Sequence, residues 1–157
     1  MKTNDCFKKR LLRNITPDKL KMKKALEMAE VKKERAEDLF SNEFYEESIV
    51  SSYTSMFQAA RALLFRDGVI EKSHACVVAY LKENYTQTLG QDRINWLDTY
   101  RLERHESMYG LEKSMVEKNE AEDALEKSEK FLWSINKIKQ FSSKRHIDVD
   151  KEYYLCL

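Results

Sequence analysis

The chain has 157 residues, which suits one domain with one hydrophobic core and leaves no room for a second full domain. Three glycines and one proline are too few for the turns of most all-β folds, whereas 35% charged and 42% hydrophobic residues suit amphipathic helices and exclude a disordered chain. The net charge of +1 divides unevenly, because residues 1–35 carry twelve basic and five acidic side chains. This basic arm suits phosphate backbones or an acidic partner, and equally a solvated helix face.

The amino-terminal third predicts one short and one long helix. Residues 5–13 hold Cys6, Phe7, Leu11 and Leu12 among basic side chains, which suits a short amphipathic helix. A long helix begins at Thr16-Pro17-Asp18, because threonine can cap, proline has a helical φ, and aspartate complements the positive helix end. Apolar residues then recur every three or four positions until about Asn42.

The middle of the chain predicts two more helices. An apolar stripe runs through about 44–67, and Gly68 follows it as a stop signal. Ser73 caps a shorter helix over 74–85, whose apolar residues occupy more than one face. His74 directly follows this cap, where the positive helix end favours a neutral imidazole bonded to a neighbouring backbone group.

The carboxyl-terminal part predicts two further helices. One runs from about Asp92 to Met108 with Gly110 as its stop, and one covers about 117–141. Four or five antiparallel helices with short connections form an up-and-down bundle, so the expected class is all-α. The tail 142–157 fits a short strand, a docking segment or frayed chain equally well.

The cysteines indicate neither a disulfide framework nor a zinc site. Cys6, Cys76 and Cys156 form an odd set without a C-x-x-C pair or a histidine at ligand spacing. The start of the chain lacks the apolar core of a signal peptide, and no apolar run reaches the length of a membrane span. We therefore expect a cytoplasmic protein in a reducing compartment, with no membrane contact, no metal and no cofactor.

One arginine stands out by its position on a predicted helix. Arg104 falls on the same stripe as Leu97, Tyr100 and Met108, which should face the core or a subunit contact. A charge buried there without a partner costs about 3–5 kcal/mol. The sequence therefore predicts that a carboxylate, a phosphate or a wet groove accompanies Arg104.

Polar side chains surround that arginine near the helix end. Arg101 and His105 are four residues apart on a neighbouring strip, and Tyr109 follows. Two guanidinium groups, an imidazole and a phenol suit a phosphate, or the attack of a ribose hydroxyl on its own phosphodiester. The structural alternative is that Arg104 pairs with an acid from another helix and only stabilises the bundle.

Several segments form a combined pattern over residues 10–140. They are Leu11-Leu12-Arg13 with Thr16-Pro17, Ala36-Glu37-Asp38-Leu39, Tyr53–Leu64 (YTSMFQAARALL), Glu71-Lys72-Ser73-His74, Arg104–Gly110 (RHESMYG) and the amphipathic stretch Ala121–Ile138. Together they resemble the small stand-alone HEPN-domain proteins of archaea and bacteria. The chain then divides into a basic arm or short helix at 1–15, a HEPN-like bundle at 16–141 and the tail at 142–157.

The resemblance implies a helical bundle that dimerises, with its polar motif near the dimer cleft. Many HEPN proteins are metal-independent ribonucleases with an arginine followed, after four to six residues, by a histidine. They often act as toxins paired with a nucleotidyltransferase antitoxin, and others bind nucleotides or scaffold a partner. In this chain Tyr109 follows Arg104 after a gap of four, and His105 follows Arg101 after a gap of only three. The ribonuclease spacing is therefore missing.

Three hypotheses follow. The first is a dimeric module that binds a nucleotide or RNA phosphate through Arg104, Arg101, Tyr109 and Arg61, with a nucleotidyltransferase as a further partner. The second is a metal-independent ribonuclease, the toxin of a toxin–antitoxin pair, with Arg104, Tyr109 and His105 as catalytic residues. The third is a purely structural adaptor in which Arg104 forms a buried ion pair.

Overall fold

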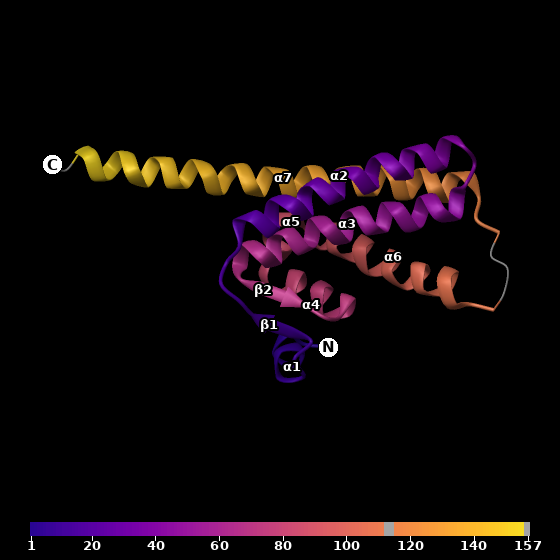
Figure 1. Cartoon of the computed structure of the whole chain (residues 1–157), viewed down its shortest axis with the longest axis horizontal. Coiled ribbons are helices and arrows are strands. Elements are labelled where there is room, and N and C mark those ends of the chain that lie inside the picture. Colours follow the sequence, from indigo (N-terminus) through magenta and orange to yellow (C-terminus); the bar gives the residue numbers. More distant parts are fainter. Residues whose placement is uncertain (112–114, 156–157) are drawn as a thin grey trace.

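The computed structural model describes the backbone of residues 1–111 and 115–155, and side chains within 1–106, 110–111 and 115–138. Its elements, in chain order, are α1 (Thr3–Lys8), β1 (Leu12–Asn14), α2 (Lys19–Ser41), α3 (Tyr45–Asp67), β2 (Val69–Glu71), α4 (His74–Asn84), α5 (Thr86–Leu89), α6 (Gln91–Tyr109) and α7 (Lys118–Leu155). Long helices dominate the described part of the chain and lie alongside one another (Figure 1). The expected all-α helical bundle is confirmed.

Local stop and start signals explain most helix bounds. The Ser73 side chain accepts a hydrogen bond from the backbone N–H of Cys76 and caps α4 as predicted. Gly68 ends α3 with φ +78°, and a Cβ there would lie 2.6 Å from the carbonyl oxygen of Ile15. Only glycine fits this left-handed and crowded position.

The start of α2 differs from the prediction. Asp18, rather than Thr16, is the capping residue, and its carboxylate accepts from the Lys21 backbone N–H at 2.9 Å. The backbone N–H of Asp18 also donates to the Phe65 carbonyl at 2.9 Å. This tertiary hydrogen bond anchors the start of α2 to the end of α3. It explains why the helix begins after Asp18 and not after Thr16.

Helix α3 is the centre of the core and packs against α2, α4, α6, α7 and β2. Its contact with α2 uses small residues and three serine hydroxyls. Ser48, Ser51 and Ser55 donate to the carbonyl oxygens of Ala36, Lys32 and Ala29, respectively, at 2.7–2.8 Å. Each donor lies one helical turn from the next, as does each acceptor, so the bonds fix the antiparallel register of the two helices.

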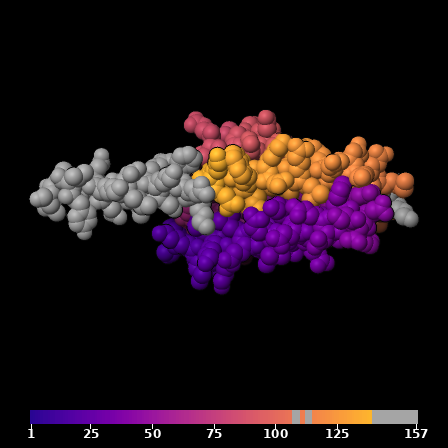
Figure 2. All heavy atoms as spheres, turned by 90° about the horizontal axis from the view of Figure 1, so that it is seen from above, coloured from indigo at the N-terminus to yellow at the C-terminus, as the bar shows by residue number. Residues whose placement is uncertain are grey.

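Helix α7 packs against both α2 and α3. Seen from above, its first part lies beside α2 along the body of the molecule (Figure 2). Ala121, Phe131 and Ile135 are buried on its inner stripe. The backbone stays helical through 142–155, where the sequence left a strand, a docking segment and frayed chain open, and α7 thereby extends beyond the other helices (Figure 1).

The amino-terminal arm corrects two expectations. After α1, residues 12–14 form β1, which pairs antiparallel with β2, so part of the predicted 5–13 helix is strand instead. Cys6 and Cys76 form a buried disulfide across 70 residues, so the prediction of no disulfide is wrong. The reducing compartment therefore loses its support from the cysteines. The strand pairing ties the arm to the segment before α4, and the disulfide ties it to α4 itself.

The part of the chain that the structure describes contains no helix with the length and apolar character needed to cross a membrane.

The serine contacts between α2 and α3 predict unequal effects of two similar substitutions. Ser55→Ala should lower the free energy of unfolding by about 1 kcal/mol, because it removes a buried hydrogen bond. Ser52→Ala is the matched control, because the Ser52 hydroxyl is equally buried but has no hydrogen-bond partner among the described residues. Urea denaturation followed by circular dichroism measures both. Equal losses in the two variants would contradict this account of the α2–α3 contact.

Candidate functional site: an arginine cluster around His74

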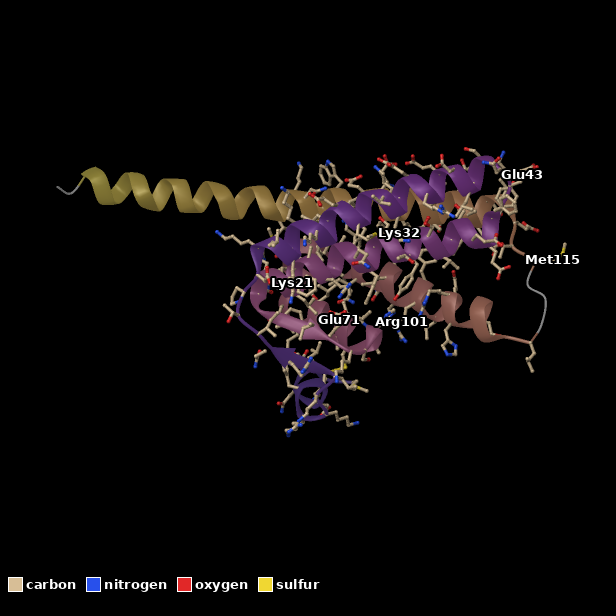
Figure 3. All side chains as sticks on the ribbon, in the orientation of Figure 1. Lys21, Lys32, Glu43, Glu71, Arg101 and Met115 are labelled. Carbon is tan, nitrogen blue, oxygen red and sulfur yellow. A yellow bond between two sulfur atoms is a disulfide. The ribbon has the colours of Figure 1, made fainter. Side chains whose placement is uncertain are left out.

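Three helices meet at the candidate site. Helix α3 contacts both α4 and α6, and α4 contacts α6. Figure 3 labels two residues of this region, Glu71 at the end of β2 and Arg101 on α6. The first residue of α4, His74, therefore begins its helix next to side chains from α3 and α6.

The His74 imidazole is held by two aromatic side chains of α3. Its Nδ1 and the Tyr53 Oη are joined by a 2.8 Å hydrogen bond. The Phe57 ring stacks on it with 3.9 Å between ring centroids. Tyr53 and Phe57 are one helical turn apart, so α3 presents both to the same partner. The expected bond from His74 to the backbone is replaced by this contact with Tyr53.

Arg104 lies over the ring of the same tyrosine. Its guanidinium carbon is 5.3 Å from the centroid of the Tyr53 ring, at cation–π distance. Burial raises the pKa of the Tyr53 hydroxyl, and although the charges of Arg104 and Arg101 oppose this, the pKa is still about 12. The phenol therefore keeps its proton at neutral pH. His74 and Arg104 are thus positioned by one buried side chain.

Arg101 and Arg61 are each held by a carboxylate. Arg101 donates from its Nε and one terminal nitrogen to Asp98, at 3.0 and 2.9 Å, and Lys82 lies 3.6 Å from the other Asp98 oxygen. Arg61 Nε lies 2.7 Å from Glu71 Oε1, and this ion pair links α3 to β2. Two cations share Asp98, so these ion pairs orient the guanidinium groups without neutralising the whole region.

These charges act on the His74 imidazole. Burial lowers its pKa below the usual 6.5, and Arg104, Arg101 and Arg61 lower it further because they repel an imidazolium. His74 is therefore neutral at pH 7, as the sequence predicted. We call Arg61, Arg101 and Arg104 the arginine cluster.

The structure thus brings together three of the five predicted site residues. Arg61 comes from α3, while Arg101 and Arg104 are one turn apart on α6. His105 is exposed on α6 and is not among the groups that shift the His74 pKa. The side chain of Tyr109 lies outside the described residues. Arg104 contacts the aromatic ring of Tyr53. From the sequence we expected a carboxylate, a phosphate or a wet groove beside this arginine, and an aromatic ring was not among these alternatives.

Sequence reasoning gave His74 and Tyr53 no functional role. Tyr53 was part of an apolar stripe, and the direction of its hydroxyl depends on how α4 packs against α3. The available signal was the Lys-Ser-His start of α4 in the family pattern, which places a histidine at the positive end of a helix.

The arrangement suits an anion. Arg61, Arg101 and Lys82 pair with only two carboxylates, Glu71 and Asp98, so one positive charge remains in surplus among these five side chains. A separate groove of about 380 Å³ between α2 and α3 is lined by Lys32, Arg35, Glu46 and Glu47 among others, so its charges balance. Within the described ranges, no group of three or more His, Cys, Asp or Glu side chains is placed to hold a metal ion.

Comparison with known proteins agrees with the pattern found in the sequence. Residues 22–138 match the family described as HEPN domain. The chain is also 29% identical over 136 residues to a Methanocaldococcus jannaschii protein named "Putative toxin MJ0142". That alignment covers 82% of this chain and 86% of the relative. The family match spans α3, α4 and α6, which carry the arginine cluster and His74.

The electrostatic account of His74 predicts the effect of removing one guanidinium. Arg104→Ala should raise the His74 pKa toward 6.5, because the imidazolium then loses its strongest repulsion from a charge. Titration of the histidine ring resonances by NMR measures the shift. Arg93→Ala is the matched control on the same helix, because Arg93 stacks on Trp96 and is not among the groups that shift His74. An unchanged His74 pKa in Arg104→Ala would refute the assignment.

Proposed function

Since the chain belongs to the HEPN domain family, we propose that it binds a phosphate group of RNA or of a nucleotide at the arginine cluster. The observation that carries this proposal is geometric: the Arg104 guanidinium carbon lies 5.3 Å from the ring centroid of Tyr53, whose Oη is 2.8 Å from His74 Nδ1. Arg101 lies one turn before Arg104 on the same helix. Guanidinium groups bind phosphate oxygens through paired, charge-assisted hydrogen bonds. The neutral imidazole adds a hydrogen-bonding group without adding charge.

Within this proposal the three arginines have different roles. Arg104 is the principal phosphate ligand, because its guanidinium is held over an aromatic ring. Arg101 adds charge from the preceding turn while Asp98 keeps it in place. Arg61 forms an ion pair with Glu71, so it attracts the phosphate through its positive charge more than through a direct contact. Tyr109, from the same helix end, stays a proposed phosphate ligand on the strength of the sequence pattern.

A second candidate function is a metal-independent ribonuclease that acts as a toxin. The observation that favours it is the toxin name of the M. jannaschii relative. In that case Arg104 stabilises negative charge on the scissile phosphate, with Tyr109 or His105 as the proton-transfer groups nearest in sequence. The missing arginine–histidine spacing counts against this version of the site.

The proposal also includes the partners that the family resemblance implies. We propose a homodimer, with a nucleotidyltransferase as antitoxin partner if the chain is a toxin. We also propose that the protein is cytoplasmic, because RNA and nucleotides are abundant in the cytoplasm. An adaptor without a ligand is the remaining alternative, in which the arginine cluster only holds α6 against α3.

Binding of a short labelled RNA with 2′-O-methyl riboses, in the presence of EDTA, tests the phosphate site. Arg104→Ala should weaken binding about tenfold, the order of one charged hydrogen-bonded contact. It should also reduce the salt dependence of log K by about 0.7, the share of one phosphate contact on a single strand. Fluorescence anisotropy at several salt concentrations measures both, and competition by a free nucleotide separates the two ligand sources.

Arg93→Ala is the control, because it removes the same charge from α6 away from the arginine cluster. We expect it to bind RNA like the unmodified protein. Equal affinities of Arg104→Ala and Arg93→Ala would place the phosphate elsewhere, and no binding to either RNA or nucleotide would favour the adaptor.

A further inference from the structure

His74 is the feature of the site that phosphate binding alone does not explain. Its ring is fixed on one face by Phe57, and its Nδ1 is bonded to Tyr53 Oη. Its other ring nitrogen, Nε2, makes no hydrogen bond among the described residues, and the side chain is only partly buried. One edge of an oriented imidazole is therefore open for a further partner.

The neighbours of His74 match what RNA cleavage without a metal requires. Such cleavage needs a base for the ribose 2′-hydroxyl and a cation for the phosphate. Arg104 contacts the ring of Tyr53 while His74 contacts its hydroxyl, so the same side chain places a cation and a base. The lowered pKa keeps the imidazole in its basic form at pH 7.

We propose that His74 is the general base of RNA cleavage in this chain, supplied by α4 in place of a histidine spaced after Arg104 on α6. This inference rests on the proposed phosphate site, because Arg104 must hold the phosphate next to the imidazole. Tyr53 is a positioning residue: its oxygen accepts from Nδ1–H, which leaves the Nε2 lone pair toward the substrate.

The step balances without an added reagent. Nε2 takes the proton of the 2′-hydroxyl, the 2′-oxygen forms a bond to phosphorus, and the bond from phosphorus to the 5′-oxygen breaks. The departing 5′-oxygen takes a proton from solvent, and protonated His74 returns its own proton to water. The products are a 2′,3′-cyclic phosphate and a 5′-hydroxyl end, and no water is consumed. Arg104 neutralises the charge that grows on the phosphate oxygens.

The experiment compares cleavage and binding in the full chain with EDTA present. Unmodified RNA is the substrate, and its 2′-O-methyl counterpart measures binding, because it cannot be cleaved by this route. His74→Asn keeps a donor toward Tyr53 but lacks the basic ring nitrogen. We expect this variant to bind the 2′-O-methyl RNA within about twofold of the unmodified protein, yet to cleave RNA at least about a hundredfold more slowly.

Arg93→Ala is the control that should cleave like the unmodified protein. Tyr53→Phe removes only the hydroxyl, so cleavage should fall while RNA binding persists. Three results would overturn the inference and leave the phosphate site intact: binding without any cleavage, equal cleavage by His74→Asn, or products with a 5′-phosphate. Absence of RNA binding in the unmodified protein would instead refute the phosphate site itself.

Discussion

The close contact between α2 and α3 is the constraint on which the rest of the structure depends. Three serine hydroxyls of α3 donate to backbone oxygens of α2, and Ala29 and Ala36 leave room for the approach. This contact fixes the rotation of α3 about its axis. Because the other face of α3 carries Tyr53 and Phe57, the same rotation brings both aromatic rings to His74 of α4 and the Tyr53 ring to Arg104 of α6. A packing contact on the opposite face of α3 therefore decides which side chains can reach His74.

The candidate site is an energetically costly arrangement of like charges. Several cations lie near one another, and burial already disfavours a charged imidazole. Ion pairs to Asp98 and Glu71 and the ring of Tyr53 offset part of this cost. A bound phosphate would offset more, because its negative charge attracts the guanidinium groups. This is why the phosphate site, rather than simple stabilisation of the bundle, is the preferred interpretation.

Features encoded in neighbouring residues could be predicted from the sequence, and features that join distant segments could not. The Ser73 cap and the Gly68 stop are local signals, and both were predicted correctly. The three-residue strands β1 and β2 and the Cys6–Cys76 disulfide connect segments far apart in the chain. Their pairing depends on how the arm docks, which no local pattern states.

The same division applies to the site. Arg104 stood out because a charge on an apolar helix stripe needs a partner. That its partner includes the ring of Tyr53, and that this tyrosine also orients His74, depends on three helices meeting. The central claim is that RNA phosphate binds next to that imidazole. The most direct test is an NMR titration with 2′-O-methyl RNA that follows the His74 ring and Arg104 Nε–H resonances. The account predicts that both shift together and saturate with binding, and unchanged resonances at saturating RNA would contradict it.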